Sequence, residues 1–263
     1  MASFDPVLDK DGVRLTVDDA IATVTLTNPA KRNAQSPALW RALAEAGRLL
    51  PGTVRVVVLR AEGKSFSAGL DRQAFTPEGF DGEPSFIDLA RGDDAELDAT
   101  IAEYQEAFTW WRRSDIVSVA AVQGHAIGAG FQLALACDLR VVADDVQFAM
   151  RETSLGLVPD LTGTHPLVGL VGQARALEIC VTGRSVQADE AVQSGLANVA
   201  VPSAELDGAV RDLAAALLAA PRDAVIETKA LLRGAGERSY EEQRVAERAA
   251  QARRLRDLAG LGE

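Results

Sequence analysis

The spacing of apolar residues along the first part of the chain is typical of β-strands. Residues 13–27, VRLTVDDAIATVTLT, alternate apolar and polar positions on both sides of Asp18-Asp19, which predicts a hairpin. Continuous apolar runs at 54–60 and 116–122 predict buried strands. Two shorter runs, at 139–143 and 146–149, predict further short strands.

Helical spacing separates these strands and then replaces them. Ser36 is a plausible N-cap, Pro37 suits the first helical position, and apolar residues recur at helical spacing up to Leu50. We expect further helices at the following places: residues 101–113, the run after Gly130, 172–182, 188–195, 203–220 and the charged tail from Arg222.

The order of these elements predicts two regions. Strands and helices alternate up to about residue 200, and helices alone follow, which indicates an α/β core over 1–200 and a helical region over 201–263. Residues 76–97 are rich in Gly, Pro and Asp and predict a mobile surface segment.

Composition narrows the function. The net charge of −11 over 263 residues argues against general nucleic-acid binding but permits an anionic small ligand held by local cations. No apolar run has the length of a membrane span, and the N-terminus lacks the pattern of a signal peptide. Cys137 and Cys180 lie in apolar stretches and are interpreted as reduced core residues, so we expect a cytoplasmic protein. Nothing in the sequence suggests a metal cluster or a redox cofactor.

Two glycine-containing loops, GKSFSAG (63–69) and GHAIGAG (124–130), each follow a predicted buried strand. Glycine allows tight bends and close approach of a ligand, and the start of a helix offers unpaired N–H groups. Two such loops at neighbouring strand ends could direct two N–H groups at one oxygen atom, as in an oxyanion hole. The alternative is that both loops are simply tight turns.

The loops do not match the motifs of three other kinds of site. A phosphate-binding P-loop needs a glycine where Val58 stands, and a dinucleotide-binding fingerprint needs one where Leu133 stands. A serine hydrolase would have to use His125 or His165, and no G-x-S-x-G motif is present. The oxyanion interpretation is therefore favoured.

Several segments together resemble the enoyl-CoA hydratase/isomerase (crotonase) family. The segments that carry the resemblance, which extends over about residues 20–202, are LTNPAKRNAQSPALWRAL, FSAGLD, VQGHAIGAGFQLALACDLRVVADDVQFAMRETSLGLVPD and ALEICVTGRSVQADEAVQSGLANVAVP. The last sixty or so residues are similar only loosely, and the aromatic and basic ending common in the family is absent from RRLRDLAGLGE.

The resemblance implies a crotonase-like spiral of β-β-α units with a C-terminal helical trimerisation region, in a homotrimer or hexamer. It also implies an acyl-CoA thioester substrate, with coenzyme A present only as part of that substrate, and acyl-pocket walls from about residues 75–115. Backbone N–H groups of Ala68 and Ala129 would hold the thioester oxygen. The segments expected to face coenzyme A contain Lys31, Arg32, Ser67, Ala68, Leu70 and Asp71. Lys31 and Arg32 could meet phosphates, or could be ordinary solvated charges.

The same resemblance identifies the proton-moving residues. Family hydratases use two glutamates; Gln132 stands at the first position and Glu152 at the second. Glutamine can orient water but cannot accept its proton near neutral pH, or it could simply bond a backbone group. Asp160 matches an aspartate of the family's dienoyl-CoA isomerases, although those enzymes also carry an acid at position 132. Arg151 replaces a usual proline. Asp160 could instead be a turn residue, and Glu152 a capping or surface carboxylate.

These residues favour a double-bond isomerase modestly over a hydratase of 2-enoyl-CoA. In this hypothesis the oxyanion hole stabilises a thioester enolate and Glu152, with Asp160, moves the protons. Two alternatives stay open: a noncatalytic acyl-CoA-binding homologue, and a thioester hydrolase or decarboxylase that uses the same oxyanion hole.

Overall fold

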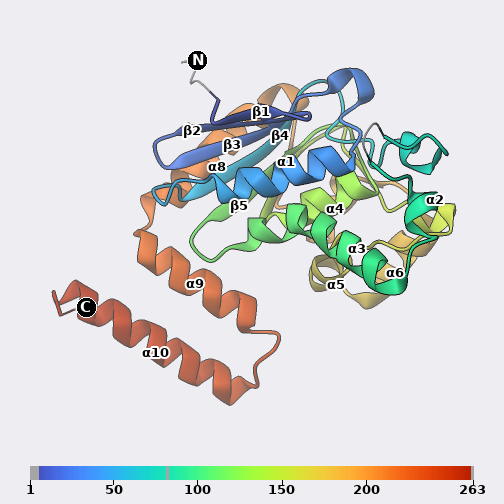
Figure 1. Cartoon of the computed structure of the whole chain (residues 1–263). Helices are drawn as coiled ribbons and strands as arrows, with labels where there is room; N and C mark the ends of the chain where they lie inside the picture. The colour runs from blue at the N-terminus through green and yellow to red at the C-terminus, as the bar shows by residue number, and fades with distance from the viewer. Residues whose placement is uncertain (1–5, 81–82, 262–263) are drawn as a thin grey trace.

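The centre of the computed structural model, which describes residues 6–80 and 83–261, is a seven-stranded sheet (Figure 1). Its strand order is β1-β2-β3-β4-β5-β7-β10; pairing is antiparallel up to β3 and parallel from there on. Strands β6, β8 and β9 form a second, small sheet. The strands are β1 (Leu8–Lys10), β2 (Val13–Asp18), β3 (Ile21–Leu26), β4 (Val56–Ala61), β5 (Val117–Val122), β6 (His125–Ile127), β7 (Leu139–Ala143), β8 (Gln147–Ala149), β9 (Val186–Gln187) and β10 (Val199–Val201).

Helices cover both faces of the large sheet. Alternate residues of β4 point to opposite faces: Val57 and Leu59 pack into the main core with α1, α3 and α4, whereas Val56 and Val58 pack against α8. Burial on both faces explains the continuous apolar runs of these strands. The helices are α1 (Pro37–Arg48), α2 (Phe86–Leu89), α3 (Asp94–Thr109), α4 (Ala129–Ala136), α5 (Thr164–Val171), α6 (Gln173–Thr182), α7 (Ala188–Gln193), α8 (Leu206–Ala219), α9 (Arg222–Gly234) and α10 (Tyr240–Leu258), with short 3₁₀ turns at Pro29–Lys31, Arg72–Phe75, Trp110–Arg112, Glu152–Leu155 and Ser203–Glu205.

Local sequence explains several of these boundaries. The predicted hairpin is confirmed as β2 and β3, with Asp19 in the left-handed region of its turn at φ 51°. The Ser36 hydroxyl accepts a hydrogen bond from the Leu39 N–H at 3.3 Å and caps α1 as expected. The glycine turn leads directly into α4 through Gly128, whose φ of 51° favours glycine.

The segment expected to be a mobile surface stretch, 76–97, is the part where the prediction was least complete. Its described residues include α2 and the first residues of α3, which begins at Asp94 rather than near residue 101. Asp93 caps α3 by accepting the Glu96 N–H at 2.8 Å. Phe75 and Phe86 pack against each other, so the segment has an apolar contact that its polar composition hid.

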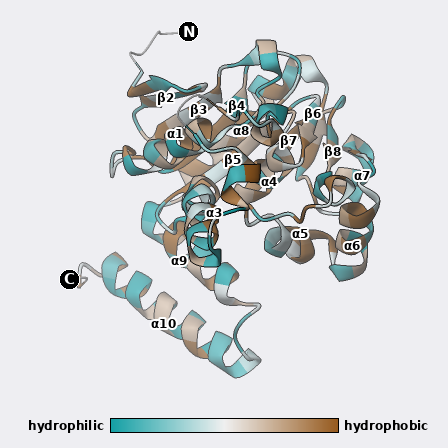
Figure 2. Ribbon diagram, turned by 45° about the vertical axis from the view of Figure 1, so that its right-hand side comes forward, coloured by the Kyte–Doolittle hydropathy of each residue, from teal (hydrophilic) through white to brown (hydrophobic). Residues whose placement is uncertain are grey.

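The C-terminal helices α9 and α10 extend away from the sheet, and α10 is largely hydrophilic (Figure 2). Arg253 of α10 binds the Glu227 carboxylate of α9 through two hydrogen bonds of 2.6 and 2.7 Å. In the described part of the chain, no helix combines the length and the hydrophobicity needed to cross a membrane.

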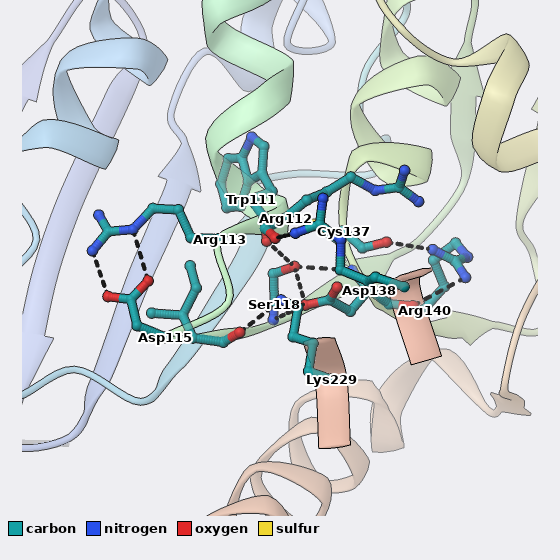
Figure 3. A network of polar contacts seen from close by, with 11 residues as sticks. Trp111, Arg112, Arg113, Asp115, Ser118, Cys137, Asp138, Arg140 and Lys229 are labelled. Atoms are coloured by element: carbon teal, nitrogen blue, oxygen red, sulfur yellow. Dashed lines mark hydrogen bonds and ion pairs between the residues drawn. The ribbon is translucent and has the colours of Figure 1, made fainter. Parts of the chain in front are cut away.

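A buried polar cluster attaches α9 to the sheet (Figure 3). The Lys229 ammonium lies 2.6 Å from Asp138 Oδ2 and donates to the Ile116 carbonyl at 2.7 Å. Ser118 contacts the same Asp138 oxygen through its N–H at 2.9 Å. Burial lowers the pKa of Lys229, and the Asp138 charge opposes that shift.

Candidate active site

The two glycine-containing loops lie against each other, as the sequence suggested. Ser67 pairs with the strand of the second loop: its N–H donates to the His125 carbonyl at 2.9 Å and its carbonyl accepts the Ile127 N–H at 3.0 Å. A Cβ at Gly69 would lie 2.4 Å from the Ile127 oxygen, and one at Gly130 would lie 2.6 Å from the Ser67 oxygen. Glycine is therefore required at both positions for this close approach.

The first expected oxyanion donor is not available. The Ala68 N–H donates to the Arg32 carbonyl at 2.9 Å, so it is already used in holding the loop. On either side of Leu70, the Gly69 carbonyl and the Asp71 N–H both pair with Gln35 at 2.8 Å. Successive N–H groups of an extended segment point to opposite sides, so the Leu70 N–H faces away from Gln35.

Leu70 and Ala129 provide the two candidate donors. Ala129 is the first residue of α4, where a backbone N–H has no partner within the helix. Among residues 6–80 and 83–261, neither of these two N–H groups has a hydrogen-bond acceptor, and both residues line one cavity. The prediction of Ala129 stays compatible with the geometry, whereas the first donor moves two residues along the loop, from Ala68 to Leu70.

A chain of buried side chains supports the first loop. The Ser67 hydroxyl accepts the Gly69 N–H at 3.2 Å and donates to the Asn33 carbonyl at 2.8 Å. Gln35 donates to the same hydroxyl at 3.2 Å and accepts the Trp40 indole N–H at 2.7 Å. Sequence reasoning missed Gln35 and Trp40 because their role depends on contacts with a loop about thirty residues away along the chain.

Gln132 is held in one orientation. It is 1% exposed, and its side-chain oxygen accepts the N–H groups of Leu161 at 2.9 Å and Gly163 at 3.2 Å. Because backbone N–H groups only donate, the amide nitrogen must face Glu152, whose Oε1 accepts its N–H at 2.7 Å. The interpretation that Gln132 bonds backbone groups is confirmed. Since its oxygen is occupied, Gln132 can act toward a water molecule only as a donor.

Glu152 lies at the glycine turn. A Cβ at Gly128 would lie 3.2 Å from Glu152 Oε1, so the carboxylate sits directly beside the residue that precedes Ala129. Glu152 Oε2 is buried and has no hydrogen-bond partner in the part of the chain that is described. Burial raises the pKa of Glu152; hydrogen bonds, including the one from Gln132, oppose the shift, and the Asp160 charge adds to it.

Asp160 lines the same cavity as Glu152 and is close enough for its charge to act on that carboxylate. Its backbone carbonyl accepts the Gln105 side-chain N–H at 2.6 Å, which ties the segment to α3. The Asp160 side chain is exposed at the cavity wall, where partial desolvation of its carboxyl group raises its pKa. Arg151 is exposed, and its side chain runs toward Gly183, where a Cβ would lie 3.4 Å from Arg151 Cδ.

A cavity of about 1120 Å³ joins these groups. Its walls are mainly apolar and come from the first loop, α2, α3, the glycine turn and the segment after Glu152. Residues from 75–115, expected to form acyl-pocket walls, contribute part of this lining. The larger apolar lining residues are Trp40, Leu70, Phe75, Phe86, Ile87, Leu89, Leu97, Ile101, Tyr104, Ile127, Leu155, Leu157, Val158 and Leu161.

The residues expected to contact coenzyme A differ in their exposure and in the bonds that they already make. Lys31 is exposed, but its ammonium lies 3.0 Å from Asp71 Oδ2, so part of its charge is already balanced. Arg32 is exposed and in the left-handed region at φ 52°, and its carbonyl holds Ala68. Ser67 is fully buried and supports the loop instead of facing a ligand. In the described ranges, no group of three or more His, Cys, Asp or Glu side chains could hold a metal ion.

Two free backbone donors beside a buried carboxylate form a site that can polarise a carbonyl oxygen and move a proton. The family model for enoyl-CoA hydratase/isomerase matches residues 16–257, and the chain belongs to this family. The fold is therefore the crotonase fold, and the protein is an enzyme of the enoyl-CoA hydratase/isomerase type.

Relatives of both reaction types are similar to the chain. The human mitochondrial Delta(3,5)-Delta(2,4)-dienoyl-CoA isomerase is 34% identical over 216 residues, which are 78% of this chain and 63% of that protein. A probable enoyl-CoA hydratase of Mycobacterium tuberculosis H37Rv is 33% identical over 89% of this chain and 83% of its own. A crystal structure from Thermobifida fusca YX, described as a putative enoyl-CoA hydratase in complex with CoA, is 51% identical, covers 95% of both chains and has a TM-score of 0.90.

Proposed function

We propose that the protein binds an acyl-CoA thioester and moves a carbon–carbon double bond within its acyl chain. The observation that carries this proposal is Glu152, which has an unpaired Oε2 and lines the same cavity as Leu70 and Ala129, the residues with free N–H groups. The Thermobifida fusca neighbour also has a structure in complex with acetoacetyl-CoA, at 52% identity, which supports a thioester ligand.

The thioester oxygen would accept hydrogen bonds from the Leu70 and Ala129 N–H groups. Charge that develops on this oxygen as a proton leaves the acyl chain is then stabilised, and removing one such donor typically costs roughly 10²–10³ in rate. Glu152 would take the proton through Oε2. The double bond shifts toward the thioester, and a proton is returned at the far carbon, so the substrate gains and loses one proton.

Asp160 is the second proton carrier in this proposal. It lies in the same cavity, and its raised pKa suits a group that is protonated for part of the cycle. Glu152 could deliver the proton itself where the two carbons are close together. A second carboxylate becomes necessary where the proton must be delivered farther along the chain than Glu152 reaches.

Hydration is the second candidate function, and the arrangement of Gln132 makes it less favoured. Adding water requires a base that takes the proton of water, and Gln132 has no basic site near neutral pH. Its oxygen is occupied by two backbone N–H groups at 2.9 and 3.2 Å. Glu152 alone would have to activate the water and exchange the α-proton. The similarity to probable hydratases is what keeps this candidate in consideration.

A paired assay tests the proposal. The purified protein is supplied first with crotonyl-CoA and longer 2-enoyl-CoA esters, then with 3-enoyl-CoA and dienoyl-CoA esters, and products are followed by mass and ultraviolet absorbance. We expect isomers of unchanged mass from the second set. A mass gain of one water as the faster reaction would overturn the isomerase proposal, and release of free coenzyme A or carbon dioxide would reveal thioester hydrolysis or decarboxylation.

We further propose that Arg32 and Lys31 bind the coenzyme A phosphates. Arg32 is exposed beside the loop that its carbonyl holds.

We also propose that the C-terminal helices contact other copies of the chain in a homotrimer or hexamer. On α9 and α10, Leu232 is 71% exposed and Leu258 is 84% exposed, and burial of such apolar side chains in an assembly is favourable. Sedimentation at several protein concentrations tests the assembly, and a monomer throughout would contradict it.

A further inference from the structure

One wall of the cavity is built from aromatic rings. Aromatic residues are only 5% of the chain, yet four of them line this cavity. The ring centroids of Phe75 and Phe86 are 5.6 Å apart in an edge-to-face arrangement. Those of Phe86 and Tyr104 are 6.4 Å apart in a stacked arrangement, and those of Tyr104 and Trp40 are 4.8 Å apart. Phe75, Phe86, Tyr104 and Trp40, named here the aromatic wall, therefore form a continuous array.

The aromatic wall presents ring surface to the cavity. Phe75 and Phe86 are half-buried, so part of each ring is open, whereas Trp40 and Tyr104 are almost fully enclosed behind them. The Trp40 N–H is already bound to Gln35 at 2.7 Å, so this residue offers its ring and no donor. Leu89 and Ile101 complete the lining nearby, which makes this part of the cavity apolar as well as aromatic.

The wall is tied to the reacting end of the site. Through Gln35 and Ser67, Trp40 is connected to Gly69, the neighbour of the Leu70 donor. Phe75 ends the short 3₁₀ turn that follows the same loop. An acyl group whose thioester oxygen rests on Leu70 would therefore extend from the loop that leads to these rings.

The cavity has room for more than a short acyl chain. Pockets for drug-sized ligands are typically about 300–1,000 Å³, and this one has about 1120 Å³. A four-carbon acyl group would leave much of the apolar lining without contacts, and each missing contact forfeits dispersion energy. A group with a ring could meet both the face and the edge offered by Phe75 and Phe86.

We propose that the acyl group of the substrate is bulky and carries an aromatic ring, in preference to a straight alkyl chain with the same number of carbons. This inference rests on the proposed function, since it assigns the acyl part of the same thioester. A ring gains stacking or edge-to-face contacts in addition to area burial, whereas an alkyl chain gains area burial alone.

Two CoA esters that contain no double bond to move test the inference by equilibrium binding to the full chain. 3-Phenylpropanoyl-CoA and nonanoyl-CoA both have nine acyl carbons, and coenzyme A itself is the reference. We expect the phenyl ester to bind more tightly by about 2- to 10-fold. Nonanoyl-CoA binding equally or more tightly would overturn the ring preference and leave the proposed function standing. Failure of both esters to bind would overturn the proposed function as well.

Variants of one wall residue locate the preference. Phe86→Leu removes a half-buried ring and keeps an apolar side chain, so we expect the affinity ratio of the phenyl ester to the alkyl ester to fall toward one. Phe86→Tyr keeps the ring and is expected to retain the ratio. Phe75→Leu repeats the test on the edge-to-face partner. An unchanged ratio in folded Phe86→Leu and Phe75→Leu proteins would contradict the role of the wall.

Discussion

Two buried polar clusters in this protein differ in whether their polar atoms all have hydrogen-bond partners. At the foot of α9, Lys229, Asp138 and Ser118 satisfy one another, with the ammonium bonded to Asp138 at 2.6 Å and to a backbone carbonyl at 2.7 Å. At the glycine turn, Gln132 is bonded on both ends of its amide, but Glu152 keeps one buried oxygen without a partner in the described chain.

Full pairing of the polar atoms is typical of a structural cluster, whereas an unpaired buried oxygen at a cavity is typical of a reactive one. A buried polar group without a partner costs about 1–3 kcal/mol, and more when it is charged, so a stable fold normally avoids it. The α9 cluster leaves no such group unpaired among Lys229, Asp138 and Ser118, and these residues attach α9 to the sheet. The Glu152 cluster has this cost beside a cavity, where a substrate atom would supply the missing partner in the proposed function.

The largest expected effect is the loss of activity in Glu152→Gln. The substitution keeps the shape of the side chain and removes its basic oxygen, so kcat/KM should fall by about 10²–10⁴ while coenzyme A ester affinity changes little. Steady-state kinetics and equilibrium binding measure both quantities. Glu205→Gln, at an exposed site, is the matched control. Retained turnover in Glu152→Gln would remove this residue from the mechanism.

Lys229→Met should have the next largest effect, on stability instead of chemistry. It leaves the Asp138 carboxylate without its cation, and breaking a buried pair typically costs about 3 kcal/mol or more. Urea unfolding measures the loss, with Lys64→Met at an exposed position as the control. At temperatures where the variant is folded, kcat should be close to that of the parent. A stability change under about 0.5 kcal/mol would show that this cluster is no anchor.

Asp160→Asn distinguishes proton delivery from a passive turn. We expect about 10²-fold slower isomerisation, the lower limit of typical acid–base contributions, with a smaller effect on any hydration. Both rates are measured on the same preparation. If the two rates fall equally, or neither falls, Asp160 is not the second proton carrier.

The smallest expected effect is a pH-dependent stabilisation by Glu152→Gln. The pKa of Glu152 is raised in the folded state, so the parent protein loses stability as pH rises through that folded pKa. The variant lacks this loss and should be more stable at neutral pH, by at most about 1 kcal/mol. The advantage should vanish as pH falls below the unfolded value. Unfolding curves at several pH values check this, and an advantage that grows in acid would contradict the sign.

Much of the fold follows from local pattern. The alternation around Asp18-Asp19 specifies the hairpin, and Ser36-Pro37 specifies the start of α1, because caps and turns depend on neighbouring residues in sequence. The apolar runs that become β4 and β5 identify strands buried on both faces. The resemblance of the second loop and of Glu152 to family motifs also indicated the candidate site, although α2 and Phe86 were hidden in a segment of polar composition.

The sequence by itself determined which segments bend, which are buried and which carboxylates are candidates for the site. Only the tertiary structure decided which backbone N–H groups are left free. Ala68 and Leu70 are both in the motif, yet Arg32 takes the N–H of the first and pairing with Gln35 turns the second outward. The fixed orientation of Gln132 likewise depends on Leu161 and Gly163. An N–H group that already donates to one acceptor is not free to bind a ligand. Local sequence does not specify which distant acceptor the fold brings near that N–H group.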